Sequence, residues 1–204
     1  MLEALALAAR RGWTELFAGL TFRVGPGEAL VVTGANGTGK TTLLRMLAGL
    51  SQPYAGEIRW KGRKVAPFDP ALRGAAAFAG HLPSLKDELT TEENLASLVA
   101  LDGGTVPRER LREALESVAL SRQRRLPARV LSQGQRRRIG LALLSLASRP
   151  LWILDEPVTA LDAAGAALMA QIVAGHLATG GIAVAATHAA LGLPAARLRS
   201  LALG

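Results

Sequence analysis

One stretch of the sequence, residues 29–49, limits the possible folds more than any other. It runs from the apolar segment ALVVT through a loop with three glycines to a helical run that ends near Gly49. The loop contains Gly34, Ala35, Asn36, Gly37, Thr38, Gly39, Lys40 and Thr41, and Thr42 follows it. A strand, a Gly-rich loop and a helix in this order are typical of the phosphate-binding loop called Walker A. The stretch therefore predicts an α/β fold with a phosphate site at the start of a helix.

The residue types in this loop indicate how such a site works. Glycines permit a tight loop whose backbone N–H groups converge on phosphate oxygens, and the helix N-terminus adds partial positive charge. We expect Lys40 to reach the β- and γ-phosphates and the Thr41 hydroxyl to ligate Mg²⁺. The alternative is a Gly-rich turn that precedes a helix by chance, and the fixed positions of the motif would arise by chance in about one of two hundred such sequences.

Two acids follow a second apolar strand, residues 151–154. Asp155 and Glu156 come directly after the segment LWIL. Parallel α/β sheets bind ligands at the carboxyl ends of their strands, so both acids are expected beside the phosphate loop. Asp155 would then hold Mg²⁺ through water, and Glu156 would activate the attacking water as a general base. Acids after a strand more often mark only an exposed strand end, but their combination with a phosphate loop favours the metal and the base.

The three histidines differ in position. His188 follows the apolar strand 182–186 and Thr187, and from there it can donate a hydrogen bond to a γ-phosphate. His81 follows the apolar segment 75–79 and has a comparable position. His176 lies inside a predicted helix, and we expect it to be structural.

Apolar runs of about five residues alternate with helical patterns over most of the chain, which favours parallel strands covered by helices. The candidate strands are residues 2–8, 20–24, 29–33, 57–60, 75–79, 151–154, 182–186 and 198–203. The turn formed by Gly25, Pro26 and Gly27 separates the second candidate from the third. It predicts that these two strands form an antiparallel pair at one edge.

The middle of the chain has a different pattern. Residues 85–149 contain no convincing strand, and Pro107 opens a segment with Leu111, Ala114, Leu115 and Val118 at helical spacing. We therefore expect one compact unit, residues 1–204, in which 1–84 and 150–204 form the core and edge sheet and about 85–149 form a helical subdomain.

Composition narrows the class of protein. Half of the 204 residues are hydrophobic, which excludes a disordered chain, and the absence of cysteine excludes disulfides and thiolate metal sites. The N-terminus places its charges after a short apolar stretch, the wrong order for a secretory signal. The formal charge of +8 suits an anionic partner. Because nearly all the basic residues are arginine, a coding bias toward arginine explains the charge equally well.

The order of these motifs resembles that of the ATP-binding cassette (ABC) ATPases across nearly the whole chain. The phosphate loop is followed by LSQGQ at 131–135, the strand with Asp155 and Glu156, the segment Ala160, Leu161 and Asp162, and then His188. The resemblance implies a P-loop NTPase (RecA-like) core with an antiparallel β edge subdomain and an inserted α-helical subdomain. It also implies ATP and Mg²⁺ as cofactors.

The resemblance gives LSQGQ a role in assembly. In this family the segment faces the phosphate loop of a second subunit across a head-to-tail dimer, so Ser132, Gly134 and Gln135 would bind the γ-phosphate of the partner's ATP at a helix N-terminus. Arg136, Arg137 and Arg138 follow, and we expect at least two of them only to solvate the helix.

Finer features resemble the ATP-binding subunits of haem exporter, or cytochrome c maturation, complexes. They include LFAGLTF at 16–22, LTTEENL at 89–95, LWILDEP at 151–157 and THAALGL at 187–193. That family carries histidine where other cassettes have the Gln of the Q-loop, and His81 fits this habit. Arg11 stands near the position of the adenine-stacking aromatic, so either Arg11 or the nearby Trp13 is expected to contact the base.

By this resemblance, two copies would dock beneath integral membrane subunits, peripherally, at the cytoplasmic face of the inner membrane. ATP hydrolysis would then move haem, or release a haem-loaded chaperone, for c-type cytochrome assembly. Residues 85–101 are the candidate docking surface. The sequence has no Cys-x-x-Cys-His motif, and we expect neither haem nor nucleic acid to bind this chain directly.

Three alternatives remain at this stage. In the first, the ATPase moves a different cargo, such as a lipid, a metal or a small solute. In the second, the chain is a soluble cassette protein that acts on nucleic acid, which the basic charge suits. Such proteins usually carry a long coiled-coil insertion or two cassettes, and this sequence has neither. The third is a regulatory module without turnover, against which Glu156 argues.

Overall fold

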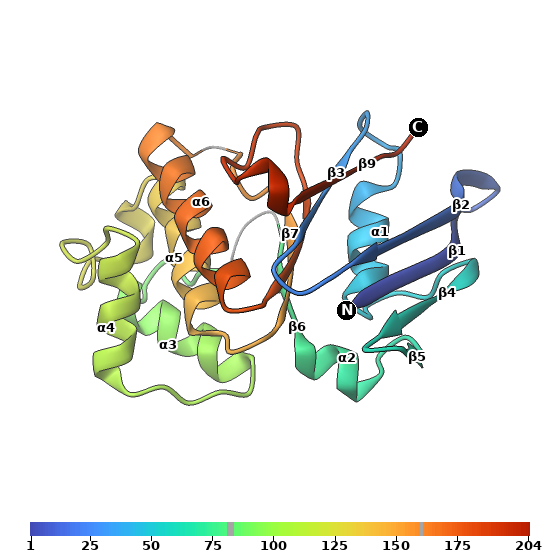
Figure 1. Ribbon diagram of the computed structural model, residues 1–204. Coiled ribbons are helices and arrows are strands. Elements are labelled where there is room, and N and C mark those ends of the chain that lie inside the picture. The colour runs from blue at the N-terminus through green and yellow to red at the C-terminus, as the bar shows by residue number, and fades with distance from the viewer. Residues whose placement is uncertain (81–83, 160) are drawn as a thin grey trace.

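Two β-sheets lie on either side of one helix, α1 (Lys40–Leu47), in the computed structural model, which describes residues 1–80, 84–159 and 161–204 (Figure 1). One sheet is parallel and the other antiparallel. Further helices cover the face of the parallel sheet that α1 does not cover. This architecture confirms the predicted P-loop α/β core with an antiparallel edge sheet.

The parallel sheet positions the phosphate loop. Its strand order is β6-β7-β8-β3-β9. The strands are β3 (Ala29–Thr33), β6 (Ala76–Ala79), β7 (Leu151–Asp155), β8 (Ile182–Ala186) and β9 (Leu198–Ala202). All neighbours in this sheet run parallel, so their carboxyl ends meet at one edge. Strands β7 and β8 are buried on both faces, which explains why they read as unbroken apolar runs.

The antiparallel sheet corrects one prediction. Its order is β2-β1-β4-β5, with β1 (Leu2–Arg11), β2 (Thr14–Val24), β4 (Ala55–Trp60) and β5 (Arg63–Val65). The predicted antiparallel pair of strands 20–24 and 29–33 is therefore wrong: β2 pairs with β1, and β3 belongs to the other sheet. A tight hairpin at Gly12 and Trp13 already supplies β2 with its partner. The turn at 25–27 instead carries the chain between the sheets, and the Gly27 amide donates to the Gly181 carbonyl at the start of β8, 2.8 Å away.

The strands of the antiparallel sheet are longer than predicted, since β2 begins at Thr14 and not at residue 20, and one strand of the parallel sheet is shorter because a helix adjoins it. The strand predicted at 75–79 begins at Ala76, because Ala75 ends the short helix α2 (Pro70–Ala75). The Asp69 side chain accepts a hydrogen bond from the Ala71 amide and caps this helix. Neither α2 nor the three-residue strand β5 was predicted, since both are too short for a periodic pattern.

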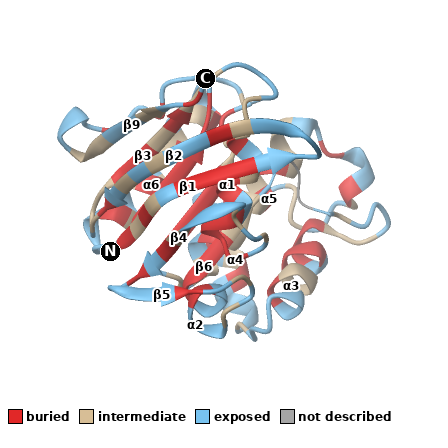
Figure 2. Ribbon diagram, turned by 90° about the vertical axis from the view of Figure 1, so that its right-hand side faces the viewer, coloured by how far each residue is buried: buried red, intermediate tan, exposed pale blue. Residues whose placement is uncertain are grey.

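The hydrophobic core has two parts, one on each face of the parallel sheet. In the first, Leu43, Leu44 and Leu47 of α1 are fully buried between the two sheets. In the second, α5 (Gln133–Leu146) and α6 (Ala163–Ala178) pack on the opposite face. Figure 2 shows the resulting run of buried residues along α1 and the central strands. This core fixes the ends of β3, β7 and β8 relative to one another.

The described part of the segment between β6 and β7 consists of helices joined by loops. It contains α3 (Thr91–Leu101), α4 (Arg108–Ser117), the 3₁₀ turn Ala128–Val130 and α5. A capping box between Thr90 and Glu93 starts α3, and a second one between Ser132 and Gln135 starts α5. The predicted helical stripe of α4 is buried, with Leu111, Ala114 and Leu115 in the second core.

Candidate functional site

The phosphate loop connects β3 to α1, and its glycines adopt backbone conformations that other residues avoid. Gly34, Gly37 and Gly39 have φ angles of 141°, 90° and 100°. A Cβ at Gly34 would lie 2.3 Å from the Leu203 carbonyl oxygen, so no side chain fits there. No side chain caps α1 at Gly39, so the amides of its first turn remain directed toward the loop. This arrangement suits an anion.

Lys40 holds its charge at the mouth of this loop. Its ammonium donates to the carbonyl oxygens of Gly34, at 2.6 Å, and Ala35, at 3.1 Å. The same Nζ lies 3.1 Å from Nε2 of His188, which is 148 positions away in the sequence. The residue is only 8% exposed. A buried cation that faces an anion-binding loop is the arrangement expected for a phosphate ligand.

Thr41 and Asp155 form a candidate magnesium site. The Thr41 hydroxyl donates to Oδ2 of Asp155 at 2.9 Å, which joins the start of α1 to the end of β7. Both groups present oxygen, the ligand atom that Mg²⁺ prefers. Among the described residues no group of three or more His, Cys, Asp or Glu side chains could hold a metal by itself. The pair therefore fits an ion that completes its shell with phosphate oxygens and water.

Glu156 is held in a strained backbone conformation at the same edge. Its φ angle is 51°, in the left-handed region, which costs a non-glycine residue about 1–3 kcal/mol. Its amide donates to the Ala186 carbonyl at the end of β8, 2.9 Å away. Oε2 accepts a hydrogen bond from the Thr159 hydroxyl at 3.0 Å, and Oε1 lies 3.8 Å from Nε2 of His188. The carboxylate is thus directed toward the histidine and the phosphate loop.

His188 connects these groups. It follows β8, and its Nε2 faces both the Lys40 ammonium and the Glu156 carboxylate. Its side chain is 53% exposed, so a ligand can reach it. The fold brings together Lys40, Glu156 and His188, which come from three separate segments. Their catalytic roles stay predictions, but their convergence is a property of the structure.

A cavity of about 280 Å³ lies over the phosphate loop. Its walls include Asn36, Gly37, Gly39, Lys40, Thr41, Thr42, Asp155 and Glu156, together with Arg11 and Leu16. Arg11 therefore lines the predicted nucleotide site from the end of β1. Trp13 does not line this cavity; it stands at the hairpin tip and is 99% exposed.

The predicted signature residues lie elsewhere on the chain. Ser132 caps α5: its hydroxyl accepts from the Gln135 amide at 3.2 Å, and the Gln135 side chain accepts from the Ser132 amide at 2.9 Å. Ser132 is exposed, and Gly134 and Gln135 are half-buried. None of the three lines the cavity over the phosphate loop.

The three arginines after the signature correct another expectation. Arg136 pairs with Asp87 at 2.6 Å and Arg138 with Asp162 at 3.1 Å. Arg137 is buried, and its guanidinium donates to the Glu156 carbonyl oxygen at 3.0 Å. The interpretation that at least two of them only solvate the helix is wrong, because loops and strand ends pack over this part of α5.

Arg137 and Thr159 contact Glu156, and the motif patterns did not indicate either of them. Arg137 precedes the buried Leu141 and Leu144 by one and two helical turns, so the apolar stripe of α5 extended backward indicates that it faces inward. Thr159 has no comparable signal, since its contact depends on the turn after Glu156.

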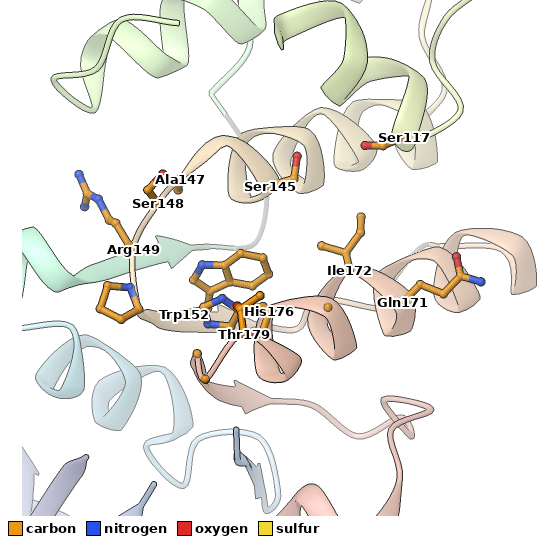
Figure 3. A pocket seen from close by; sticks show the side chains of 14 residues that line it. Ser117, Ser145, Ala147, Ser148, Arg149, Trp152, Gln171, Ile172, His176 and Thr179 are labelled. Atoms are coloured by element: carbon orange, nitrogen blue, oxygen red, sulfur yellow. The ribbon is translucent and has the colours of Figure 1, made fainter. Parts of the chain in front are cut away.

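The remaining histidines divide as follows. His81 lies outside the described residues. His176 of α6 stacks on Trp152 with ring centroids 3.9 Å apart, and its Nε2 lies 3.1 Å from the Ile182 carbonyl oxygen. Burial lowers the pKa of the His176 imidazole. These contacts confirm its structural role. Figure 3 shows both rings at the wall of a cavity of about 610 Å³, which lies at the amino ends of β7 and β8, away from the phosphate loop.

Comparisons with known proteins agree with this geometry. The sequence model of the ABC transporter family matches residues 17–159. The "Cytochrome c biogenesis ATP-binding export protein CcmA" of Dechloromonas aromatica is 47% identical over 204 residues, which cover all of both chains. A protein of the same name from Pseudomonas aeruginosa is 47% identical over 193 residues, 95% of each chain.

Solved structures share the fold. An ABC transporter ATP-binding protein from Pyrococcus furiosus superimposes with a TM-score of 0.84 at 26% identity, over 99% of this chain and 96% of that one. A dimeric ATP-binding cassette bound to ADP and Pi, in a post-hydrolysis state, gives a TM-score of 0.78 at 23% identity, over 93% of this chain and 88% of that one. The chain therefore belongs to the ABC transporter family of ATPases and, within it, to the CcmA family.

Proposed function

We propose that this ABC ATPase is the ATP-hydrolysing subunit of a membrane complex that exports haem, or releases a haem-loaded chaperone, in c-type cytochrome biogenesis. The convergence of Lys40, Glu156 and His188 beside the phosphate loop carries the hydrolytic part of the proposal. The cargo part is supported by relatives named for cytochrome c biogenesis, one of them 47% identical over the full length of both chains.

In the proposed mechanism each group has one task. The loop amides and Lys40 hold the β- and γ-phosphates, and Arg11 contacts the nucleotide from the wall of the cavity. Thr41 and Asp155 would hold Mg²⁺, which supplies positive charge to the phosphate oxygens. His188 donates a hydrogen bond to the γ-phosphate, so its Nε2, which now faces the Lys40 ammonium, must carry the proton when ATP binds.

Glu156 acts on the attacking water. Its carboxylate takes a proton from the water while the water oxygen bonds to the γ-phosphorus. The bond from this phosphorus to the bridging oxygen breaks, and ADP leaves with the electron pair. The left-handed backbone and the Thr159 hydrogen bond direct the carboxylate, so less reorganisation is needed when the water binds.

Two copies would complete each site. Ser132 and Gly134 stand at the N-terminus of α5, and neither residue lines the nucleotide cavity of its own chain. In a head-to-tail dimer they would reach the γ-phosphate held by the partner's loop. Hydrolysis removes this bridging charge, so the closed dimer opens and the chemical step becomes subunit motion.

The proposed membrane contact lies on α3 and the loop before it, residues 85–101. A cavity of about 210 Å³ opens here between β6, α3 and α5, with Phe78, Leu98 and Leu143 among its lining residues. Such a hollow suits an apolar side chain presented by a helix of a membrane subunit. Within residues 1–80, 84–159 and 161–204, no helix has both the length and the apolar character to cross a bilayer. We place the subunit at the cytoplasmic face of the inner membrane.

The test is Glu156→Gln in a strain that lacks its own copy of this subunit. The variant retains the phosphate-binding groups and loses only the base, so we expect kcat for ATP to fall by about 10² to 10⁴ with a KM within about three-fold of the wild-type value. We also expect no mature c-type cytochrome by haem-stained gel, whereas the wild-type chain restores it. Normal ATPase activity of Glu156→Gln would contradict the mechanism. If the wild-type chain restores another transport process in this strain but does not restore the cytochromes, the result supports the alternative cargo.

A further inference from the structure

A buried arginine contacts the backbone of the proposed general base. Arg137 of α5 is 8% exposed, and its Nη1 donates to the Glu156 carbonyl oxygen at 3.0 Å. The Arg137 side chain makes no ion pair with an acid among the described residues. Burial lowers the pKa of its guanidinium, and the negative charge of Glu156 partly offsets this effect. A buried cation without a paired acid costs folding free energy, which indicates that the contact serves another purpose.

The contact acts on a backbone that has few other restraints. The Glu156 amide is held by Ala186 of β8, and the Glu156 carbonyl is held by Arg137 and, at the longer distance of 3.3 Å, by the Thr159 amide. The φ angle of 51° is unfavourable for a residue with a side chain. A strained conformation persists only when its surroundings fix it, and Arg137 supplies the restraint from outside the β7 to β8 segment.

From this geometry we propose that Arg137 is a positioning residue that orients the Glu156 carboxylate for hydrolysis and makes its orientation depend on the position of α5. The proposal rests on the proposed function of Glu156 as the base. It adds a residue outside the five motifs to the hydrolytic machinery.

The position of Arg137 on α5 gives the contact a second consequence. Ser132 and Gly134 at the start of the same helix are the groups proposed to bind the partner's ATP. Arg137 follows Ser132 by five residues, about 7.5 Å along a helix axis. If α5 shifts when Ser132 and Gly134 bind the partner's ATP, Arg137 moves with it. This movement would change the restraint on Glu156, which acts on the ATP bound to its own chain. One buried side chain thus links the two sites of a dimer.

The main experiment compares Arg137→Met with the wild-type chain. Methionine keeps much of the buried volume but cannot donate to the carbonyl oxygen. We expect kcat to fall by about ten- to a hundred-fold, because a small displacement of a catalytic group has an effect of this size, while the KM for ATP stays within about two-fold. Arg137→Gln retains an amide donor and is expected to recover part of kcat. Arg125→Met, which replaces an exposed arginine in the turn that follows α4, is the matched control and should leave both constants unchanged.

A double-mutant cycle separates positioning from a general structural effect. If Arg137 acts only through the Glu156 carboxylate, Arg137→Met in a Glu156→Gln background changes the residual rate by less than about two-fold. A further loss equal to that in the wild-type background would overturn the proposal. An unchanged kcat in Arg137→Met would do the same. If circular dichroism shows that Arg137→Met does not fold, Arg137→Gln is used instead. Partial activity of Arg137→Gln with a normal KM for ATP supports the positioning role. Full activity or a raised KM contradicts it.

The two proposals fail in distinguishable ways. If Glu156→Gln itself hydrolyses ATP normally, the assignment of the base is wrong and the role of Arg137 falls with it. If Glu156→Gln is inactive and Arg137→Met is fully active, the base is retained and only the positioning role is rejected.

Discussion

At the scale of single residues, the site depends on backbone conformations that few side chains tolerate. Glu156 accepts a left-handed conformation, and three loop glycines avoid the same problem by having no Cβ. A Cβ at Gly34 would meet the backbone of Leu203, and a Cβ at Gly39 would meet the side chains of Leu16 and Phe17. Substitutions here should therefore affect binding and folding together.

Gly34→Ala tests this point. The added methyl group would lie 2.3 Å from the Leu203 carbonyl oxygen, at a φ angle of 141°, so we expect a loss of at least about 2 kcal/mol in the free energy of unfolding. Affinity for a fluorescent ATP analogue should fall at least about ten-fold, because the loop must shift. Gly74→Ala is the control, since a Cβ there meets no atom within 4 Å and φ is not positive. Wild-type affinity and stability in Gly34→Ala would show that the loop is not constrained as described.

The sequence predicts most residues of the site because the motif fixes them locally. Lys40, Thr41 and Asp155 lie at strand ends or helix starts, where spacing along the chain determines position. The partners of Arg136, Arg137 and Arg138 could not be predicted, because they depend on what packs over α5, and this information is not local. The proximity of Lys40 and His188 could be expected only through the sheet order, which places β8 beside β3.

At the scale of elements, charge holds the helical segment together. Glu92 at the start of α3 is 7% exposed and faces Arg108, Arg112 and Arg124. Burial raises the pKa of its carboxyl, but the Arg108 hydrogen bond and the positive charges of all three arginines outweigh burial, so the pKa is lowered overall. This carboxylate joins α3, α4 and the loop that follows α4.

Glu92→Gln should lower the free energy of unfolding by about 2–3 kcal/mol at pH 7, because three guanidinium groups lose their anion. A lowered folded-state pKa stabilises the protein above the unfolded value of 4.5, and this stabilisation is lost as the pH falls through the folded pKa. The difference between variant and wild type should thus shrink in urea unfolding between pH 7 and pH 3. Glu113→Gln, whose ion pair is exposed, is the control. An equal difference at both pH values would contradict the ionic origin.

The sequence predicts the strands that are long apolar runs, but it does not predict which strands pair when the partner is chosen by contacts between distant segments. The strands of the parallel sheet are buried on both faces, so their sequences are unbroken apolar runs. The pairing of β2 was mispredicted because the turn at 25–27 looks like a hairpin, whereas it connects two sheets. The same turn residues can form a hairpin or connect two sheets. Here the hairpin at Gly12 and Trp13 pairs β2 with β1, so the turn at 25–27 connects the sheets.

At the scale of the whole molecule, the signature residues Ser132, Gly134 and Gln135 do not line the cavity over the phosphate loop. Its lining includes residues proposed for nucleotide binding and hydrolysis, among them Lys40, Thr41 and Glu156. Ser132 is exposed with its hydroxyl already engaged in a helix cap. A second copy that presents this helix to the cavity would supply what the single chain lacks.

The central claim is that ATP joins two copies through Ser132 and Gly134, and light scattering on sized Glu156→Gln protein tests it most directly. With Mg-ATP we predict the mass of a dimer, with ADP a monomer, and with Ser132→Arg added to Glu156→Gln a monomer that still binds ATP. A Glu156→Gln chain that stays monomeric while saturated with ATP would contradict the account, as would a dimer that Ser132→Arg leaves intact.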